Sequence, residues 1–238
     1  MEEKNYDENG VHPPSLKEYN NIVPWADVEF PFSNKDGFAR YSILGILGYV
    51  HLLGLPNTNI LEIGVGESSI YLTEIARRLQ RKIFYCDIAM GKLYNPMTVK
   101  GYIHEDIRLV REFEVIEEDN HKAIAYCGPS DSFFTNIKCM NNIGIAFIDG
   151  DHKYEQVKKD FINTLELLVP HGVIFLHDTF PNKEELVLGE YCADAYKVRK
   201  EIELDSRLDC FTFTKTVGVD VGITMVRKKL VNGVYYNE

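Results

Sequence analysis

Acidic residues and histidines recur directly after the short apolar runs of this chain. Asp149 and His152 follow the run at residues 143–148, and the pair His177-Asp178 follows the run at residues 172–176. Carboxylates and imidazoles are the side chains that most often transfer protons or bind metal ions. His152 lies three residues after Asp149, so both side chains can point into one pocket from a single strand-to-helix turn. A hydroxyl group bound there could lose its proton to the imidazole.

Two glycines follow the apolar run at residues 59–63. Gly64 and Gly66 allow a tight turn and let a ligand approach the backbone without a Cβ atom in the way. The dinucleotide fingerprint requires a third glycine, but Ser69 stands at that position. Glu62 precedes the first glycine, and its carboxylate suits a cationic or hydroxyl-rich ligand better than a pyrophosphate. These residues are therefore candidates for ligand binding.

Asp87 and the pair Ser130-Asp131 are candidates for binding a nucleoside. Asp87 lies 21 residues after Gly66, at the end of the next apolar run. A carboxylate there can accept hydrogen bonds from both ribose hydroxyls of an adenosine-containing ligand. Ser130 and Asp131 follow the run at residues 123–127 and could reach an adenine edge. Capping of the next helix would explain them equally well.

The elements that must position these residues alternate along the chain. Short β-branched runs alternate with amphipathic stretches, which predicts βαβ units and a mostly parallel sheet. The predicted parallel strands cover residues 59–63, 82–86, 123–127, 143–148 and 172–176. Two further strands, at residues 210–214 and 221–226, are joined by a short link and should be antiparallel. Because ligands bind at the carboxyl ends of parallel strands, the candidate residues should share one rim of the sheet.

The predicted helices lie between and around these strands. One should begin at Ser68 or Ser69, with either serine as its cap, and another begins near Tyr154 with an apolar stripe at helical spacing. Further helices are predicted at residues 36–53 and 183–202. Residues 89–121 fit neither a strand nor a clean helix, which is typical of a functional lid or insertion.

Three regions follow from this pattern. Residues 1–57 form an amino-terminal arm and helix, residues 58–230 the ligand-binding domain, and residues 231–238 a tail. Within the arm, the aromatic residues Trp25, Phe30 and Phe32 more often anchor such a segment than line a binding site.

Composition narrows the classes of partner. The 238 residues carry 26 Lys and Arg against 36 Asp and Glu, a net charge of −10, which disfavours nucleic acid or an anionic membrane as partner. No apolar stretch approaches the roughly 20 residues that span a bilayer. The five cysteines form no C-x-x-C pair, as expected for free thiols in a reducing compartment. We therefore expect a soluble, cytoplasmic protein with a small-molecule partner, and leave a homo-oligomer open.

Four segments resemble successive motifs of class I S-adenosylmethionine-dependent methyltransferases. They are residues 60–66 (Ile-Leu-Glu-Ile-Gly-Val-Gly), 85–87 (Tyr-Cys-Asp), 146–154 (Ala-Phe-Ile-Asp-Gly-Asp-His-Lys-Tyr) and 171–179 (His-Gly-Val-Ile-Phe-Leu-His-Asp-Thr). The last two are similar to the branch with the macrolide-sugar O-methyltransferases and, more distantly, the catechol-type O-methyltransferases. The resemblance covers about residues 58–228. It implies an α/β, Rossmann-like, doubly wound sheet of seven strands, mostly parallel with an antiparallel last strand, plus the amino-terminal helical arm.

The resemblance also implies roles for the candidate residues at the cofactor. Glu62, Gly64 and Gly66 would line the methionine and ribose part of S-adenosylmethionine. Asp87 would hold the ribose, and Ser130 with Asp131 would lie near the adenine.

At the acceptor, the resemblance implies a base and a metal site. Macrolide-sugar enzymes use a histidine three residues after the strand-four acid as base, which is His152 here. Metal-dependent members bind a divalent cation through that acid and an adjacent pair after strand five, here Asp149 and His177-Asp178. Because Mg²⁺ prefers oxygen ligands, His177 as a ligand would favour Mn²⁺, iron or zinc. A site without metal is the alternative.

These residues together predict an S-adenosylmethionine-dependent O-methyltransferase. The acceptor would be a hydroxyl of a sugar or a small natural-product-like molecule, with His152 as base and Asp149 and Asp178 holding Mg²⁺ or Mn²⁺ if a metal assists. Two other classes stay open. One is a non-catalytic binding or assembly module with the same fold. The other is a nicotinamide-dependent oxidoreductase, against which Glu62, the missing third glycine and the reversed last strand argue.

Overall fold

The structure, a computed structural model, describes residues 42–89, 104, 106–188, 192–214, 221–231 and 234–235. The predicted amino-terminal arm with Trp25, Phe30 and Phe32 lies outside the described residues. So do residues 36–41 of the first predicted helix and residues 90–103 of the predicted insertion.

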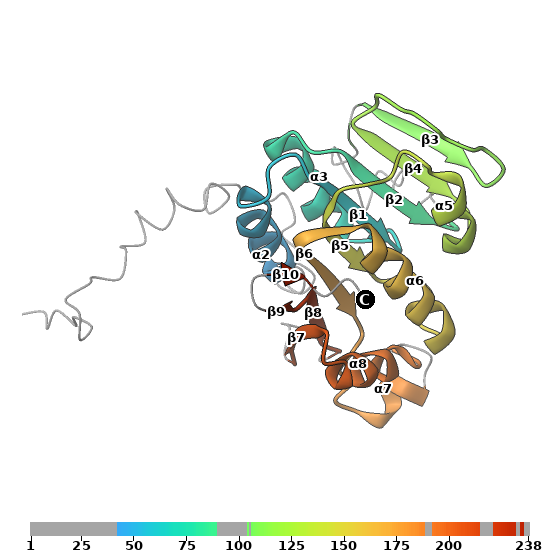
Figure 1. Cartoon of the computed structure of the whole chain (residues 1–238). Coiled ribbons are helices and arrows are strands. Elements are labelled where there is room, and N and C mark those ends of the chain that lie inside the picture. Colours follow the sequence, from blue (N-terminus) through green and yellow to red (C-terminus); the bar gives the residue numbers. More distant parts are fainter. Residues whose placement is uncertain are drawn as a thin grey trace, which may run out of the picture. The chain divides into compact units, whose positions relative to one another are not determined.

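An eight-stranded sheet forms the centre of the fold, in the order β3-β4-β2-β1-β5-β6-β8-β7 (Figure 1). The strands are β1 (Asn59–Ile63), β2 (Ile83–Asp87), β3 (Ile107–Arg111), β4 (Ala123–Cys127), β5 (Ile143–Ile148), β6 (Leu168–His177), β7 (Leu208–Phe213) and β8 (Ile223–Lys228). Strands β3, β4, β2, β1, β5 and β6 pair in parallel, whereas β8 is antiparallel to both β6 and β7. The predicted Rossmann-like, mostly parallel sheet with a reversed strand near its carboxyl terminus is thus confirmed, but it has eight strands where seven were predicted.

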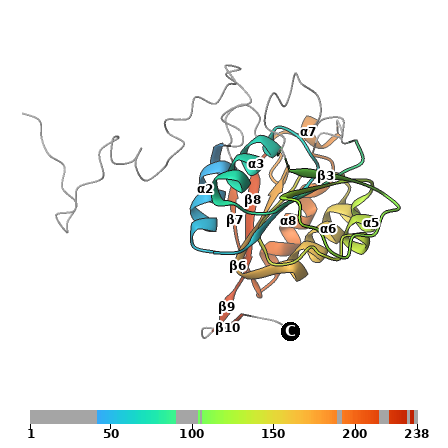
Figure 2. The ribbon, with the colours of Figure 1, turned by 90° about the horizontal axis from the view of Figure 1, so that it is seen from above.

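Helices cover both faces of the sheet, which explains why its central strands are buried and mostly apolar. They are α2 (Ser42–Leu53), α3 (Ser68–Leu79), α5 (Ser130–Asn136), α6 (Tyr154–Leu167), α7 (Glu184–Leu188) and α8 (Ala195–Leu204). In Figure 2, α2 and α3 lie on one side of the strands and α5, α6 and α8 on the other. All six residues of β5 are buried as a result. A small separate hairpin pairs β9 (Leu230–Val231) with β10 (Val234–Tyr235).

The predicted insertion contains a strand that the sequence pattern concealed. Residues 107–111 form β3 at the edge of the sheet, next to β4. Two arginines flank its centre, and only Val110 is fully buried. An edge strand pairs on one side only, so it needs less apolar character than a central strand, and its periodicity is correspondingly weak.

Two of the predicted helix caps need correction, although α3 begins at Ser68 and α5 at Ser130. The residue before α3 is Glu67 and the residue before α5 is Pro129, and neither makes a side-chain capping bond. The capping roles predicted for Ser68 or Ser69, and for Ser130 or Asp131, are therefore wrong. The hydroxyl of Ser68 instead donates a hydrogen bond to the buried carboxyl of Glu62. Residues 183–202, predicted as one helix, contain two separate helices, α7 and α8.

Two further features agree with the composition. All five cysteines are free thiols, and Cys86 and Cys192 are buried. Within the described ranges, every helix is too short or too polar to cross a bilayer.

Strand register brings the candidate residues to one rim. Ile63 at the end of β1 pairs with Cys86 of β2 and with Ile148 of β5, and Ile148 pairs with Leu176 of β6. The residues that directly follow these paired residues in the chain, Gly64, Asp87, Asp149 and His177, consequently lie at the same edge of the sheet. Asp149 and His177 become neighbours in this way, although they are far apart in sequence.

Candidate functional site

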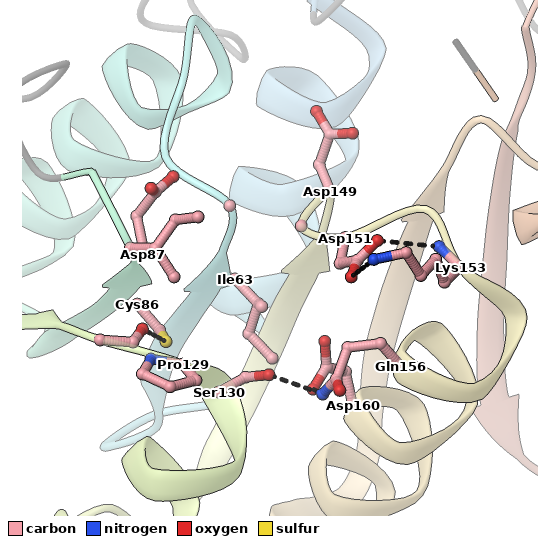
Figure 3. Close-up of a pocket in the computed structure, with 14 residues that line it drawn as sticks. Ile63, Cys86, Asp87, Pro129, Ser130, Asp149, Asp151, Lys153, Gln156 and Asp160 are labelled. Atoms are coloured by element: carbon pink, nitrogen blue, oxygen red, sulfur yellow. Dashed lines mark hydrogen bonds and ion pairs between the residues drawn. The ribbon is translucent and has the colours of Figure 1, made fainter. Parts of the chain in front are cut away.

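A pocket of about 500 Å³ lies at the carboxyl ends of β1, β2, β4 and β5 (Figure 3). Its lining comprises Ile63, Gly64, Cys86, Asp87, Ile88, Gly128, Pro129, Ser130, Asp149, Gly150, Asp151, Lys153, Gln156 and Asp160. Of the residues predicted to bind a cofactor, Gly64, Asp87 and Ser130 line this pocket. Glu62 in β1, Gly66 in the loop after it and Asp131 in the first turn of α5 lie outside its lining.

Gly64 is where the loop after β1 packs against the loop after β5. Its φ is +85°, and a Cβ atom at this position would lie 1.9 Å from the carbonyl oxygen of Asp149. Only glycine combines this backbone angle with this contact. A Cβ atom on Gly66, by contrast, would meet nothing within 4 Å. Gly64 therefore lets the loop after β1 lie directly against Asp149 in the loop after β5, and Gly66 leaves open space for a ligand.

Asp87 fixes the loop that it faces. Its Oδ2 accepts a hydrogen bond from the backbone N–H of Val65 at 2.8 Å, and its Oδ1 accepts one from Ala89 at 2.6 Å. A carboxylate has about four lone-pair sites, so two remain for hydroxyl groups of a ligand. The side chain is thus held in place with acceptor capacity to spare.

Glu62 is completely buried beside this loop. Burial raises the pKa of Glu62 to about 8, against the opposing effect of neighbouring serine hydroxyls. Ser68 Oγ donates to its Oε1 at 2.5 Å, while its Oε2 makes no hydrogen bond to any described residue. A buried polar atom without a partner is costly unless a ligand or water satisfies it.

Two aspartates and two histidines form a cluster at the ends of β5 and β6. His177 Nδ1 lies 3.0 Å from Asp149 Oδ1 and 3.2 Å from Asp178 Oδ1. On the other side, His152 Nε2 lies 3.4 Å from Asp149 Oδ1 and 3.2 Å from Asp178 Oδ2. Each carboxylate therefore contacts both imidazoles. The structure brings together all four residues that the sequence singled out for base and metal roles.

The electrostatics of this cluster follow from its burial and its pairing. Burial alone would lower the pKa of His177, but Asp149 and Asp178 raise it to about 10. Burial alone would raise the pKa of Asp149, but the His177 charge and hydrogen bonds from His152 and His177 hold it well below its ordinary value. At neutral pH, His177 is therefore an imidazolium beside an ionised Asp149.

Asp178 adopts a backbone conformation that is uncommon for a residue with a side chain. Its φ is +56°, in the left-handed region, and its side chain is buried. Aspartate and asparagine tolerate this region better than most residues, yet it remains strained. Such strain is found preferentially at functional sites, where the surrounding structure enforces it.

Three members of the cluster could hold a metal ion together. Asp149, His152 and Asp178 each offer one ligand atom, and these atoms lie within 4.8 Å of one another. Two carboxylate oxygens and one imidazole nitrogen fit Mn²⁺, iron or zinc better than Mg²⁺. His177, predicted as a ligand from the sequence, points its Nδ1 at the two carboxylates instead.

Sequence analysis did not find Gln156 and Asp160, which line the same pocket from α6. The apolar stripe of that helix, with Val157 and Phe161 buried against the sheet, dominates its pattern. The available signal was the four-residue spacing, which places two polar side chains on one side of a helix directly after the Asp-Gly-Asp-His turn.

Comparison with protein families gives one match. A family model described as a methyltransferase domain matches residues 61–179, which is half of the chain. The matched part begins in β1 and ends just after Asp178, so it contains every candidate residue described above. No curated protein matches the chain.

Solved structures with a similar fold are distant in sequence. An O-methyltransferase from Bacillus cereus in complex with SAH is 15% identical, with a TM-score of 0.54 over 93% of this chain and 94% of that one. A putative caffeoyl-CoA O-methyltransferase from Staphylococcus aureus is 16% identical, with a TM-score of 0.56 over 91% and 93%. The O-methyltransferase TomG from Streptomyces achromogenes, in complex with SAM, is 13% identical, with a TM-score of 0.50 over 91% and 99%. At these identities the similarity shows the fold.

Proposed function

Since this chain belongs to the methyltransferase-domain family and is an S-adenosylmethionine-dependent methyltransferase, we propose that its acceptor is a hydroxyl group of a sugar or small natural-product-like molecule. The single observation that carries this proposal is the position of His152 Nε2. It lies between two carboxylate oxygens, 3.4 Å from Asp149 and 3.2 Å from Asp178, beside the cofactor pocket. A hydroxyl group needs such a base because it is a weak nucleophile at neutral pH.

In this proposal the pocket of about 500 Å³ holds the nucleoside part of the cofactor. Asp87 accepts hydrogen bonds from the ribose hydroxyls, and Ser130 and Asp131 lie near the adenine. Glu62, Gly64 and Gly66 lie along the methionine and ribose part, where Oε2 of Glu62, which has no hydrogen-bond partner among the described residues, suits a polar group. When bound, S-adenosylmethionine supplies a methyl group that leaves its sulfonium for the acceptor oxygen.

The charges of the cluster favour a proton on His152. Two carboxylates face one imidazolium, that of His177, so the cluster is one positive charge short of neutrality when His152 is neutral. Because Nε2 faces two oxygens that only accept hydrogen bonds, it carries the hydrogen of the neutral imidazole, and the proton that leaves the acceptor hydroxyl supplies this charge when it moves to His152 Nδ1. Asp149 and Asp178 then stabilise the new imidazolium through the contacts that they already make.

A divalent cation is the second candidate for the positive charge that the cluster lacks. The convergence of Asp149, His152 and Asp178 favours it. A metal ion would lower the pKa of a hydroxyl group that binds to it. A neutral imidazole has one nitrogen lone pair, and a metal ion would use it, so His152 cannot be base and ligand at once. The two versions of the mechanism therefore exclude each other.

Calorimetric titration and activity assays distinguish these versions. S-Adenosylhomocysteine is titrated into the protein with a chelator, with Mg²⁺ and with Mn²⁺, and methyl transfer to a panel of glycosides and phenols is followed under the same conditions. A base mechanism predicts full activity with the chelator and a loss of roughly 10²- to 10⁴-fold in kcat for His152→Gln with unchanged cofactor affinity. Activity that requires added Mn²⁺ would support the metal version. Turnover of a nitrogen or carbon acceptor only would refute the proposed acceptor class.

The setting of this activity is part of the proposal. Five free thiols fit a reducing compartment, and we place the protein in the cytoplasm for that reason. Its net charge of −10 fits a small-molecule acceptor rather than nucleic acid. A homo-oligomer is compatible with this function but not required by it.

A further inference from the structure

The far end of the cofactor pocket is closed by three polar side chains from α5 and α6. Gln156 Nε2 lies 2.9 Å from Ser130 Oγ and 3.0 Å from Asp160 Oδ1. The bond between Ser130 and Gln156 crosses from one helix to the other (Figure 3). The Ser130 hydroxyl also hydrogen-bonds the carboxyl group of Asp160. All three residues line the pocket.

This network determines which way the amide of Gln156 points. Its NH₂ group has two N–H donors, and Ser130, Asp160 and, at 3.3 Å, Asp131 offer three acceptors for them. The opposite orientation would place the amide oxygen against the carboxylates of Asp160 and Asp131. Because an ionised carboxylate only accepts hydrogen bonds, the nitrogen must face these residues. The Oε1 atom is left as an acceptor without a partner among the described residues.

The other side-chain groups at this end are acceptors as well. The Ser130 hydroxyl hydrogen is used by Asp160, and Pro129 has no N–H to offer. Asp160 itself is nearly fully buried, at 1% exposure. These side chains fit a ligand group that donates hydrogen bonds and disfavour a carbonyl oxygen placed against them.

We propose that Gln156 Oε1, held in this orientation by Asp160, accepts a hydrogen bond from the exocyclic amine of the cofactor's adenine and makes the pocket select an amino purine over an oxo purine. Gln156 is then a binding residue and Asp160 a positioning residue. This inference rests on the proposed placement of the cofactor's adenosine in this pocket. It adds a specificity determinant on α6 to the loop residues that the sequence indicated.

The test compares two ligands by calorimetry at pH 8. One is S-adenosylhomocysteine, and the other is S-inosylhomocysteine, in which a carbonyl replaces the exocyclic amine. The wild-type protein should bind the inosine compound about 10- to 100-fold more weakly, because its carbonyl faces the amide oxygen of Gln156. Gln156→Leu removes the acceptor and should reduce this ratio to below about threefold. Asp160→Asn offers a donor to the amide, permits its rotation and should lower the ratio as well.

Asp151→Asn is the matched control, since Asp151 is another acid that lines the pocket but, among the described residues, its hydrogen bonds are with Lys153 alone. It should keep the wild-type ratio. If Gln156→Leu leaves the ratio of the two affinities unchanged, the inference is overturned. The same holds if the wild-type protein binds both ligands equally. Either result leaves the proposed cofactor site intact. A ratio unchanged in Asp160→Asn overturns the positioning role. If the wild-type protein binds neither ligand, the proposed cofactor site itself is wrong, and the inference about Gln156 falls with it. Because the readout is a ratio of two affinities, a variant that is only less stable does not move it.

Discussion

His152 Nε2 lies 3.2 Å from Asp178 Oδ2, which joins the turn after β5 to the end of β6. The parallel register of these two strands makes this contact, because Ile148 and Leu176 are paired and the residues that follow them emerge at one rim. The same pairing places His177 against Asp149. The proposed base is therefore held by the sheet and not by its own loop alone.

Asp178→Asn should lower kcat by roughly 10- to 100-fold through the loss of one charge beside His152. Asparagine tolerates the left-handed backbone of this position, so the fold should be retained. Steady-state kinetics with a saturating acceptor measure the effect, and calorimetry with S-adenosylhomocysteine should show an unchanged Kd. Asp151→Asn, an acid in the neighbouring turn, should stay within about twofold of the wild type. An equal loss of activity in both variants would indicate a general effect of charge and not this contact.

Asp87→Ala should weaken the binding of S-adenosylhomocysteine by about 10- to 150-fold, the effect of losing charge-assisted hydrogen bonds to a ribose. Part of the loss has another source, because Asp87 also accepts the Val65 and Ala89 amides. Asp87→Asn retains one acceptor oxygen and should lose less affinity. Calorimetric titration of both variants separates these contributions. If Asp87→Ala kept the affinity of the wild-type protein, the proposal that Asp87 binds the ribose would be wrong.

The two glycines of the loop after β1 should respond differently to alanine. Gly64→Ala places a Cβ atom 1.9 Å from a carbonyl oxygen at a positive φ, and we expect a loss of at least about 2–3 kcal/mol in the free energy of unfolding. In a chain of this size that lowers the Tm by roughly 5–10 °C. Gly66→Ala meets open space and should change the free energy of unfolding by about 1 kcal/mol or less.

Thermal and denaturant unfolding of the two variants, measured side by side, test this contrast. A Gly66→Ala variant that is as unstable as Gly64→Ala would contradict it. Weaker cofactor binding in a folded Gly66→Ala variant would instead support the use of the open space at Gly66 by the ligand.

Glu62 should make the protein less stable as the pH rises from about 5.5 to 8. Burial raises its pKa in the folded state from 4.5 to about 8, so in this interval the folded protein binds a proton that the unfolded chain has released. Stability is then greatest at the acid end of the interval and falls by at most about 1.4 kcal/mol per pH unit.

Glu62→Gln removes this titration but keeps the size of the side chain. Denaturant unfolding at several pH values should give a smaller decrease for the variant than for the wild type. His177 contributes a decrease of the same sign above pH 6.5, because its pKa is also raised, to about 10, and this contribution is present in both proteins. Parallel pH profiles for the two proteins would show that Glu62 is ionised in the folded state across the whole interval.

Local sequence determined the elements that carry the chemistry. The β-branched runs and the amphipathic stretches are local patterns, and the strands from β1 to β8 were predicted to within a few residues, with the exception of β3. The candidates Asp87, Asp149 and His152 could be singled out because each follows a buried run, and the carboxyl ends of parallel strands share one edge. The helix caps failed because the hydroxyl of Ser68 is used by Glu62, which is a contact that helix signals do not report.

Only the tertiary structure decided how these residues meet. Strand order and register bring His177 and Asp178 to Asp149 and His152, and the resulting distances select Asp149, His152 and Asp178 as the set that could converge on one ion. Packing of α6 against the rim adds Gln156 and Asp160, which the apolar stripe of that helix concealed. Contacts between distant segments depend on packing of the whole chain, whereas residue type and spacing report only the local backbone. The sequence therefore determined which groups are available, and the fold decided which of them act together.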